Sequence, residues 1–471
     1  MSPYAGSWYP EQASELGRLL DEKFEDSRRR IGPFCYSDGL AFVTPHAGPI
    51  YSGTVAAAVY RTIQEQQPER IILLAFPHRG GLRGIAQPDS DAILTPLGEV
   101  AVSELHGVRR LPESELCDHS FEIQLPFLQK SVPRARIAPV YVGHMLEEDR
   151  RAVAAELAAE WRPGTVFVAS SDFTHYGRSF GFVPFPPDGN AASRLRELDY
   201  ECIDAAGSID SALFLETLAA NRSTVCGTDP IALLLDVLQK LGSGDIFQST
   251  LDYQTSGEIT GDYYHSVSYA ALGYFRRASL ELSESDRDAL LDSASATLDC
   301  LRQTGERRPV PARNASAALL SKRGVFISLH QGDDLLGCIG NCAGRRALAG
   351  EVAHLTLAAA LEDPRFRPAA QVDGSIDIEI SVLTPFRRIR SADQLCVGRH
   401  GAFLTLGRHS GLLLPQVADR REWTAAEFLE ALARKCMLGP HAWRDPKARL
   451  FVFEAQVFSR AGSVRESSRP L

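Results

Sequence analysis

Hydrophobic runs of two kinds alternate along the first half of the chain. Apolar residues recur at helical spacing in segments such as 150–161 and 229–242. In the second segment, Asp229 as N-cap and Pro230 at the first helical position favour a helix start. Short runs rich in β-branched and aromatic residues, typical of buried strands, occur at 40–44, 70–76, 136–143, 165–173 and 266–275. This alternation predicts an α/β domain with a central sheet flanked by helices.

The pattern changes after residue 276. A polar stretch precedes a segment of helical spacing, which Ser283 is expected to cap. Strand-like runs separated by Gly and Pro turns follow, at 324–330, 377–385, 401–407, 410–417 and 448–458. With a helical segment at 425–436, they predict an α+β second domain. The expected organisation is a first domain over 1–277, a second over 281–463 and a disordered tail over 464–471.

Composition narrows the class of protein. The chain has 471 residues, more than one hydrophobic core usually supports, so we expect two domains. Its net charge of -9 argues against nucleic acid or an anionic membrane surface as the main partner. No apolar stretch is long enough to span a membrane, and the N-terminus does not resemble a signal peptide. Nine scattered cysteines fit reduced thiols, so the predicted location is the cytoplasm.

Chemistry-bearing residues follow three of the predicted strands. The run at 40–44 leads into "PHAG", that at 70–76 into "PHRGG", and the strand beginning at residue 165 into "SSDFTHYG". Ligands of open α/β sheets bind outside the carboxyl ends of the strands. We therefore expect the residues of these motifs to share one crevice: His46, His78, Asp172 and His175.

Cys226 lies in "STVCGTDPI", just before the helix expected at 229–242. The unpaired N–H groups and dipole of a helix start favour a thiolate, which is a nucleophile or a metal ligand. Most free cysteines are instead small buried apolar residues. With two imidazoles nearby, a His/His/Cys site for Zn, Fe or Cu is an equally good interpretation.

Two further segments supply residues that can support such a site. In "CDHSFEIQLPFLQ", Ser120 and Glu122 are expected to cap a helix, and His119 or Glu122 can reach the crevice and hold a ligand residue in place. Trp8, in "GSWYP", is expected in the core or in a cleft wall.

These motifs together resemble the Memo family over residues 1–275. That family is similar to the catalytic B subunit of class III extradiol dioxygenases, which are non-haem iron enzymes of mixed α/β fold. The resemblance implies metal ligation by His46, His78 and Cys226, with the cysteine standing where the dioxygenases use a carboxylate. It implies a divalent metal, Fe(II) first, with Zn or Cu as alternatives. It also suggests Asp172 and His175 as pocket residues, His175 matching an acid/base histidine.

The sequence departs from the family pattern beside two of these ligands. Arg79 replaces a histidine next to His78, Ala75 replaces a glycine, and Pro49 stands where an aromatic residue is usual. If Arg79 faces the cleft, it favours an anionic ligand. A solvated surface position is the alternative.

The second half resembles the AMMECR family over residues 281–463, through "LLGCIGNCAG", "LEDPRFRP" and "GRHGAFLTLGRHSGLLLPQVA". No activity follows from that resemblance. Leu336 stands where the family has an arginine. The residues singled out for chemistry, against packed structural roles, are Cys338, Glu379, Arg399 and His400.

The two families accompany a radical S-adenosylmethionine protein in a prokaryotic three-part system, called AmmeMemoRadiSam. The chain lacks the CxxxCxxC motif of that protein, so the partner is expected on a separate chain. One functional hypothesis is a metal-dependent oxidoreductase related to dioxygenases. A second is a non-catalytic adaptor that binds a peptide or small molecule. A third is a hydrolase that uses a metal-activated water or Cys226 as nucleophile.

Overall fold

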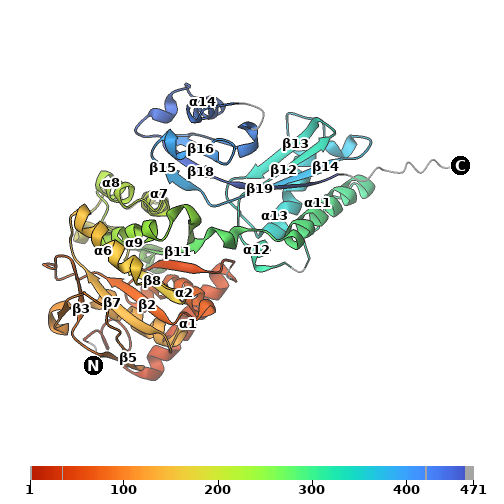
Figure 1. Cartoon of the computed structure of the whole chain (residues 1–471). Coiled ribbons are helices and arrows are strands. Elements are labelled where there is room, and N and C mark those ends of the chain that lie inside the picture. The colour runs from red at the N-terminus through yellow and green to blue at the C-terminus, as the bar shows by residue number, and fades with distance from the viewer. Residues whose placement is uncertain (1–2, 34, 314, 419–421, 462–471) are drawn as a thin grey trace. The chain divides into compact units, whose positions relative to one another are not determined.

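The computed structural model describes residues 3–33, 35–313, 315–418 and 422–461 (Figure 1). It divides into two compact units, the first ending at Arg277 and the second beginning at Ala278, with the stretch at 33–36 grouped with the second. The tail predicted at 464–471 lies outside the described residues. Within the described ranges, no helix is both long and apolar enough to cross a membrane.

A mixed nine-stranded sheet forms the centre of the first unit. Its main path runs β10-β11-β1-β8-β2-β7-β3-β6, and β9 pairs with β11. Neighbouring strands are parallel from β1 through β8 and β2 to β7, whereas β11 is antiparallel to β1 and to β10. The strands are β1 (Gly39–Thr44), β2 (Arg70–Ala75), β3 (Ile85–Pro88), β6 (Arg110–Leu111), β7 (Arg136–Val142), β8 (Thr165–Ser170), β9 (His175–Gly177), β10 (Ile246–Thr255) and β11 (His265–Arg276). A separate hairpin pairs β4 (Ala92–Thr95) with β5 (Gly98–Ala101).

Burial explains why the central strands were predictable. Every residue of β1 and β8 is buried, as expected for parallel strands covered on both faces. Side chains of β1, β2, β7 and β8 share one core with α6 to α9, and α2 packs against β1, α1 and α5. The helices are α1 (Ala13–Ile31), α2 (Pro49–Gln66), α3 (Glu113–Leu116), α4 (His119–Glu122), α5 (Gln124–Ser131), α6 (Glu147–Ala159), α7 (Ala191–Gly207), α8 (Ser211–Asn221), α9 (Thr228–Lys240) and α10 (Ser256–Thr260). The predicted mixed α/β class is confirmed.

The start of α9 differs from the prediction. Its N-cap is Gly227, so Asp229 and Pro230 lie in the first turn instead of at the N-cap and first position. The first turn still tolerates Pro230, because an N–H there has no intrahelical partner.

The second unit contains two four-stranded sheets, ordered β13-β12-β14-β19 and β15-β18-β16-β17. Helices α11 and α13 share a core with the first sheet, and α14 shares a core with the second. Ser283 and Asp286 form a capping box at the start of α11, as the sequence indicated for Ser283. The run at 448–458 is not one strand but two, which belong to different sheets. The strands are β12 (Val325–Gln331), β13 (Asp334–Asn341), β14 (Asp377–Leu383), β15 (Arg387–Ile389), β16 (Gly401–Leu406), β17 (His409–Leu413), β18 (Arg449–Phe453) and β19 (Ala455–Arg460), and the helices are α11 (Glu284–Thr304), α12 (Ala317–Leu320), α13 (Leu348–Leu361) and α14 (Ala425–Lys435).

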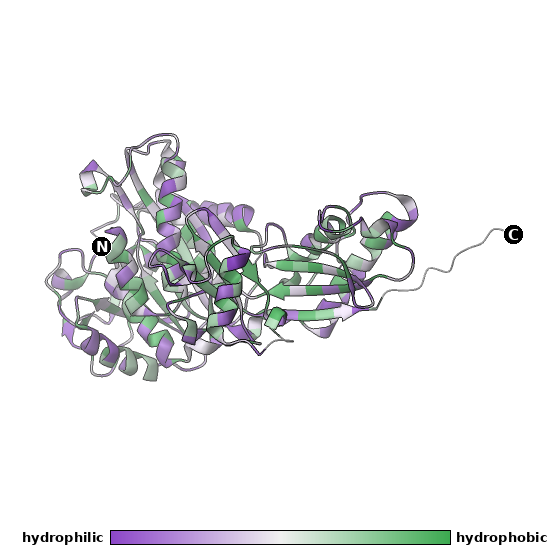
Figure 2. Cartoon of the chain, turned by 90° about the horizontal axis from the view of Figure 1, so that it is seen from above, coloured by the Kyte–Doolittle hydropathy of each residue, from purple (hydrophilic) through white to green (hydrophobic). Residues whose placement is uncertain are grey.

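Hydropathy follows this layering. The strands carry mostly hydrophobic residues, whereas hydrophilic residues recur along the helices (Figure 2).

The α+β class predicted for the second domain is confirmed.

Candidate metal centre

Two imidazoles and a thiol meet at the carboxyl edge of the parallel strands. His46 follows β1, His78 follows β2, and Cys226 precedes α9. One ligand atom from each lies within 4.8 Å of the other two. The His46 and His78 ring centroids are 5.1 Å apart, and His46 Nε2 lies 3.1 Å from Cys226 Sγ. The strand order, with only β8 between β1 and β2, produces this convergence.

The hydrogen bonds around Ser170 fix the tautomer of His46. Ser170 Oγ donates its single proton to the carbonyl oxygen of Ser120 at 2.5 Å and accepts from Gln124 Nε2 at 3.1 Å. His46 Nδ1, 3.0 Å from Ser170 Oγ, must therefore be the donor of that contact. Nε2 keeps its lone pair and faces Cys226.

Asp118 fixes the tautomer of His78 in the same way. Its Oδ2 accepts from the backbone N–H of His78 at 2.8 Å and lies 2.9 Å from Nδ1, which therefore carries the proton. Asp118 also caps α4 by accepting from the backbone N–H of Ser120, so the caps expected at Ser120 and Glu122 are corrected to Asp118. Burial raises the pKa of Asp118, but the hydrogen bonds from His78 and Ser120 outweigh it and hold the pKa well below its usual value.

The surroundings of Cys226 favour the thiol, whereas its place before a helix favours a thiolate. Burial, followed by the charge of Asp172, raises the pKa of Cys226 far above that of a free thiol. The backbone N–H of Asp172 donates to Sγ at 3.2 Å, but this contact does not offset the loss of solvent. Because His46 Nε2 has no proton, the S–H group donates to it. A cation in this position would displace the thiol proton.

Asp172 and His175 lie on the same side of the sheet. Asp172 Oδ1 accepts from the backbone N–H of His46 at 2.8 Å, which anchors the turn after β1. Burial raises the pKa of Asp172, opposed by the charge of His175. His175 Nδ1 lies 3.0 Å from the carbonyl oxygens of Phe173 and Thr224, so Nδ1 carries a proton and Nε2 is the acceptor atom of the neutral ring.

His119 and Trp8 extend the cluster outward as stacked rings. The His119 ring stacks on His78 with centroids 4.1 Å apart, and Trp8 stacks on His119 at 4.3 Å. Burial, and then the neighbouring charge of His78, lowers the pKa of His119 to about 4. His119 is therefore a neutral imidazole at physiological pH. Its atoms also form a second close group with His78 and Asp118, in which Asp118 already orients His78.

Glu122 and Arg79 are the other two residues predicted for the site in this domain. Glu122 is buried in α4. Arg79 is exposed, and its Nη1 donates to the carbonyl oxygen of Ser114 at 2.8 Å. The surface alternative for Arg79 is therefore the one observed.

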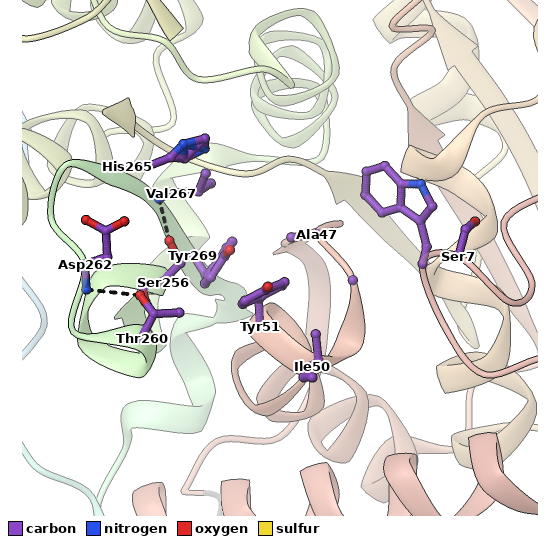
Figure 3. Close-up of a pocket in the computed structure, with 12 residues that line it drawn as sticks. Ser7, Ala47, Ile50, Tyr51, Ser256, Thr260, Asp262, His265, Val267 and Tyr269 are labelled. Atoms are coloured by element: carbon purple, nitrogen blue, oxygen red, sulfur yellow. Dashed lines mark hydrogen bonds between the residues drawn. The ribbon is translucent and has the colours of Figure 1, made fainter. Parts of the chain in front are cut away.

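A pocket of about 530 Å³ adjoins the turn that carries His46. Its walls come from the segment after Gly6, the start of α2, α10 and β11 (Figure 3). Its lining includes Trp8, Ile50, Tyr51, Asp262, His265 and Tyr269. The sequence did not predict that α10 and β11 line this pocket. The strand pattern at 266–275 does not indicate which end of the strand faces a cavity.

Two of the residues singled out in the second unit share one cross-strand row. Cys338 on β13 pairs with Ser328 on β12, which pairs with Glu379 on β14. Ser328 Oγ donates to Cys338 Sγ at 3.3 Å. In the part of the chain that is described, no group of three close metal-ligating side chains includes Cys338 or Glu379.

Arg399 and His400 are held by Glu454. Arg399 Nε lies 2.9 Å and His400 Nε2 3.7 Å from Glu454 Oε1. His400 Nδ1 accepts from the backbone N–H of Cys396 at 3.0 Å. The contacts tie together the chain between β15 and β16 and the junction between β18 and β19. Leu336, which replaces the family's arginine, packs against the apolar core beneath α13.

The fold and site define a protein with two units, an α/β unit that gathers imidazoles and a thiol at strand ends and an α+β unit. The family model described as "Memo-like protein" matches residues 2–273, and the model described as "AMMECR1" matches residues 292–458. The chain belongs to the Memo-like family and carries an AMMECR1 domain fused after the Memo domain.

Two named relatives and one solved structure are each similar to part of the chain. The chain is 29% identical over 286 residues to the protein memo-1 homolog of Caenorhabditis elegans, covering 57% of this chain and 80% of the relative. It is 34% identical over 280 residues to a MEMO1 family protein of Methanosarcina acetivorans, covering 57% of this chain and 96% of the relative. A crystal structure of an uncharacterised Pyrococcus horikoshii protein is 30% identical, with 39% of this chain and 95% of that chain covered and a TM-score of 0.34.

Proposed function

We propose that the Memo domain binds one divalent metal ion through His46 Nε2, His78 Nε2 and Cys226 Sγ, and that it is a metal-dependent oxidoreductase related to dioxygenases. The observation that carries the proposal is that one ligand atom from each of His46, His78 and Cys226 lies in one close group, while the Nδ1 contacts of the two rings leave Nε2 as the acceptor of a neutral imidazole. Mixed thiolate and imidazole ligands suit Fe(II), Zn(II) and copper, and Fe(II) is the metal we propose. A thiol and two neutral imidazoles become a complete donor set once the thiol proton leaves.

The neighbouring residues have separate tasks in this proposal. The bound metal would supply a Lewis acid and an open position for dioxygen or substrate. His175 Nε2, the acceptor atom, takes a proton from the substrate and returns it. Asp172 holds the backbone of the turn that carries His46. The pocket beside that turn receives the organic part of the substrate.

The pocket also favours a second candidate function, that of an adaptor. Ile50 and Tyr51 are exposed large hydrophobic residues in its lining, as expected where a peptide or small molecule binds. The raised pKa of the Cys226 thiol speaks against its use as a hydrolytic nucleophile.

Metal analysis of protein kept free of oxygen tests the site. We expect about one metal ion per chain, and we expect the double variant His46→Ala, Cys226→Ala to lose it. A double variant of the same residue types in the second unit, His354→Ala with Cys300→Ala, is the control and should keep the metal. Equal metal content in the two double variants would disprove the proposal.

We further propose that the full chain acts with a radical S-adenosylmethionine protein encoded separately. The support is the fusion of two families that accompany such a protein, which fixes their ratio and raises their effective concentration for each other. Co-expression followed by affinity purification should recover both chains together. Failure to co-purify under anaerobic conditions would count against the three-part system.

A further inference from the structure

Three aromatic rings stack on one another at the proposed metal centre, and the first of them is the proposed ligand His78. His78 stacks on His119 at 4.1 Å with an interplanar angle of 30°, and His119 stacks on Trp8 at 4.3 Å with an angle of 24°. The other contact of His119 within the cluster, with His46, is edge-on at 86°. Trp8 ends the stack and is 38% exposed. The stack therefore gives continuous π contact from a ligand to solvent.

We propose that Trp8 is a one-electron donor to the metal centre and the residue at which the protein is oxidised when that centre meets peroxide. This inference rests on the proposed function, with Fe(II) bound. An indole loses an electron more easily than an imidazole, so Trp8 is the donor and His119 is the bridge. The stacked rings provide the path, because the contacts leave no gap between Trp8 and His78.

The reaction balances with peroxide as the named oxidant. Reduction of one hydrogen peroxide to two water molecules takes two electrons and two protons. One electron comes from Fe(II), which becomes Fe(III), and the other comes from the indole of Trp8. The indole N–H supplies one of the protons and solvent supplies the other, which leaves a neutral indolyl radical. A small thiol can then restore Trp8 by giving it a hydrogen atom and becoming a thiyl radical.

As an electron donor, Trp8 protects the proposed cysteine ligand Cys226 from oxidation. When the metal is bound, Cys226 is a thiolate, and a thiolate that supplies electrons to peroxide moves toward sulfinic and sulfonic acids that cannot be reversed. Trp8 supplies the second electron instead, at a place where cellular reductants reach it. The cysteine ligand is thereby kept intact.

Other aromatic residues are placed less well. Tyr4 contacts Trp8 and His119 only edge-on, with centroids 6.0 and 5.9 Å away. Trp161 packs under Arg276, whose guanidinium lies 5.5 Å from its ring. Trp423 packs in the core around α14 in the second unit. Among the described aromatic side chains, Trp8 alone ends a face-to-face stack on a proposed ligand.

The experiment uses the full chain loaded with Fe(II) without oxygen, with metal content measured on the same sample. One equivalent of hydrogen peroxide is added with a nitroso spin trap, and the trapped adducts are located by peptide mass spectrometry. We expect the adduct on Trp8, several-fold above any other tryptophan. Trp8→Phe should abolish it and raise oxidation of Cys226 several-fold, whereas the matched control Trp423→Phe should change neither. His119→Leu should lower trapping at Trp8 several-fold, although Trp8 is still present.

The outcomes separate this inference from the proposed function. Protein that holds iron but shows no adduct at Trp8 overturns the inference and leaves the metal site standing. Equal trapping in His119→Leu and wild type overturns the role of the stack. An adduct on Trp8 in metal-free Cys226→Ala shows oxidation by bulk peroxide and also overturns the inference. Protein that binds no metal overturns both proposals.

Discussion

Replacing Asp118 by Asn tests whether a hydrogen bond outside the ligand set controls metal binding. Asp118 accepts three hydrogen bonds, from the backbone N–H and Nδ1 of His78 at 2.8 and 2.9 Å and from the backbone N–H of Ser120 at 2.8 Å. Asn can keep the cap to Ser120, but it then places an NH2 group against two N–H donors of His78. His78 is released to move its proton to Nε2, the atom required by the metal. Asn in the flipped orientation loses the cap instead.

The loss of the hydrogen bond between Asp118 and His78 is expected to weaken metal binding. Removing the partner that orients a ligating histidine weakens metal binding by about 10–100-fold. That factor corresponds to about 1.4–2.8 kcal/mol of binding free energy. The three ligand atoms stay in place, so binding should weaken without being abolished.

Competition with a chromophoric chelator for Zn(II) measures this affinity directly. The matched control is Asp210→Asn, which changes a carboxylate that caps α8 by accepting from Leu213 N–H at 3.0 Å. We expect the control to keep the wild-type affinity, and thermal melts of both metal-free variants report on folding. An Asp118→Asn protein that melts like the control and binds Zn(II) as tightly as wild type would refute the argument.

Two further outcomes are expected. Burial raises the pKa of Cys226, so the metal-free site carries a proton on sulfur at neutral pH that metal binding must release. The association constant should therefore rise about tenfold per pH unit below that pKa, measured by chelator competition from weakly acidic to weakly basic pH, and a flat profile would contradict a protonated thiol. In the second unit, Gly337→Ala should lower the melting temperature measured by calorimetry, because its Cβ would overlap the carbonyl oxygen of Ala359. Gly350→Ala in α13, where a Cβ meets open space, should be neutral or stabilising by up to about 1 kcal/mol, and equal melting of the two variants would contradict the packing argument.

The sequence was informative about the site where backbone topology decides the outcome. His46 and His78 follow strands that are each parallel to β8, and the carboxyl ends of such strands share one edge. The motifs "PHAG" and "PHRGG" therefore suffice to predict that the two rings approach. One of the elements that were missed is the short strand β5, in which only one of four residues is buried.

The sequence was uninformative where long-range contacts decide the chemistry. Ser170 looks like the last residue of a buried strand, yet it orients His46 from 124 positions away. Cys226 looks like a residue at a helix start, and only its assembled surroundings raise the pKa of its thiol. Trp8 likewise stacks on His119 although the two residues lie in separate segments of the sequence. No periodic pattern relates the two segments. Tautomers, pKa shifts and ring stacking depend on the assembled neighbours, which no local pattern contains.

Cys226, the proposed metal ligand, and Cys338 look alike in sequence. Both have a glycine neighbour, but the glycines around Cys338 have packing reasons. Gly337 allows β13 to approach the backbone of α13, and a Cβ at Gly340 would overlap the ring of Phe326. Cys338 accepts a hydrogen bond from a hydroxyl group on the next strand. Among the described residues, no group of close metal-ligating side chains places an imidazole beside it. Cys226 instead faces the unprotonated Nε2 of His46, so the convergence of donor atoms, and not the spacing of glycines, distinguishes the proposed ligand from Cys338.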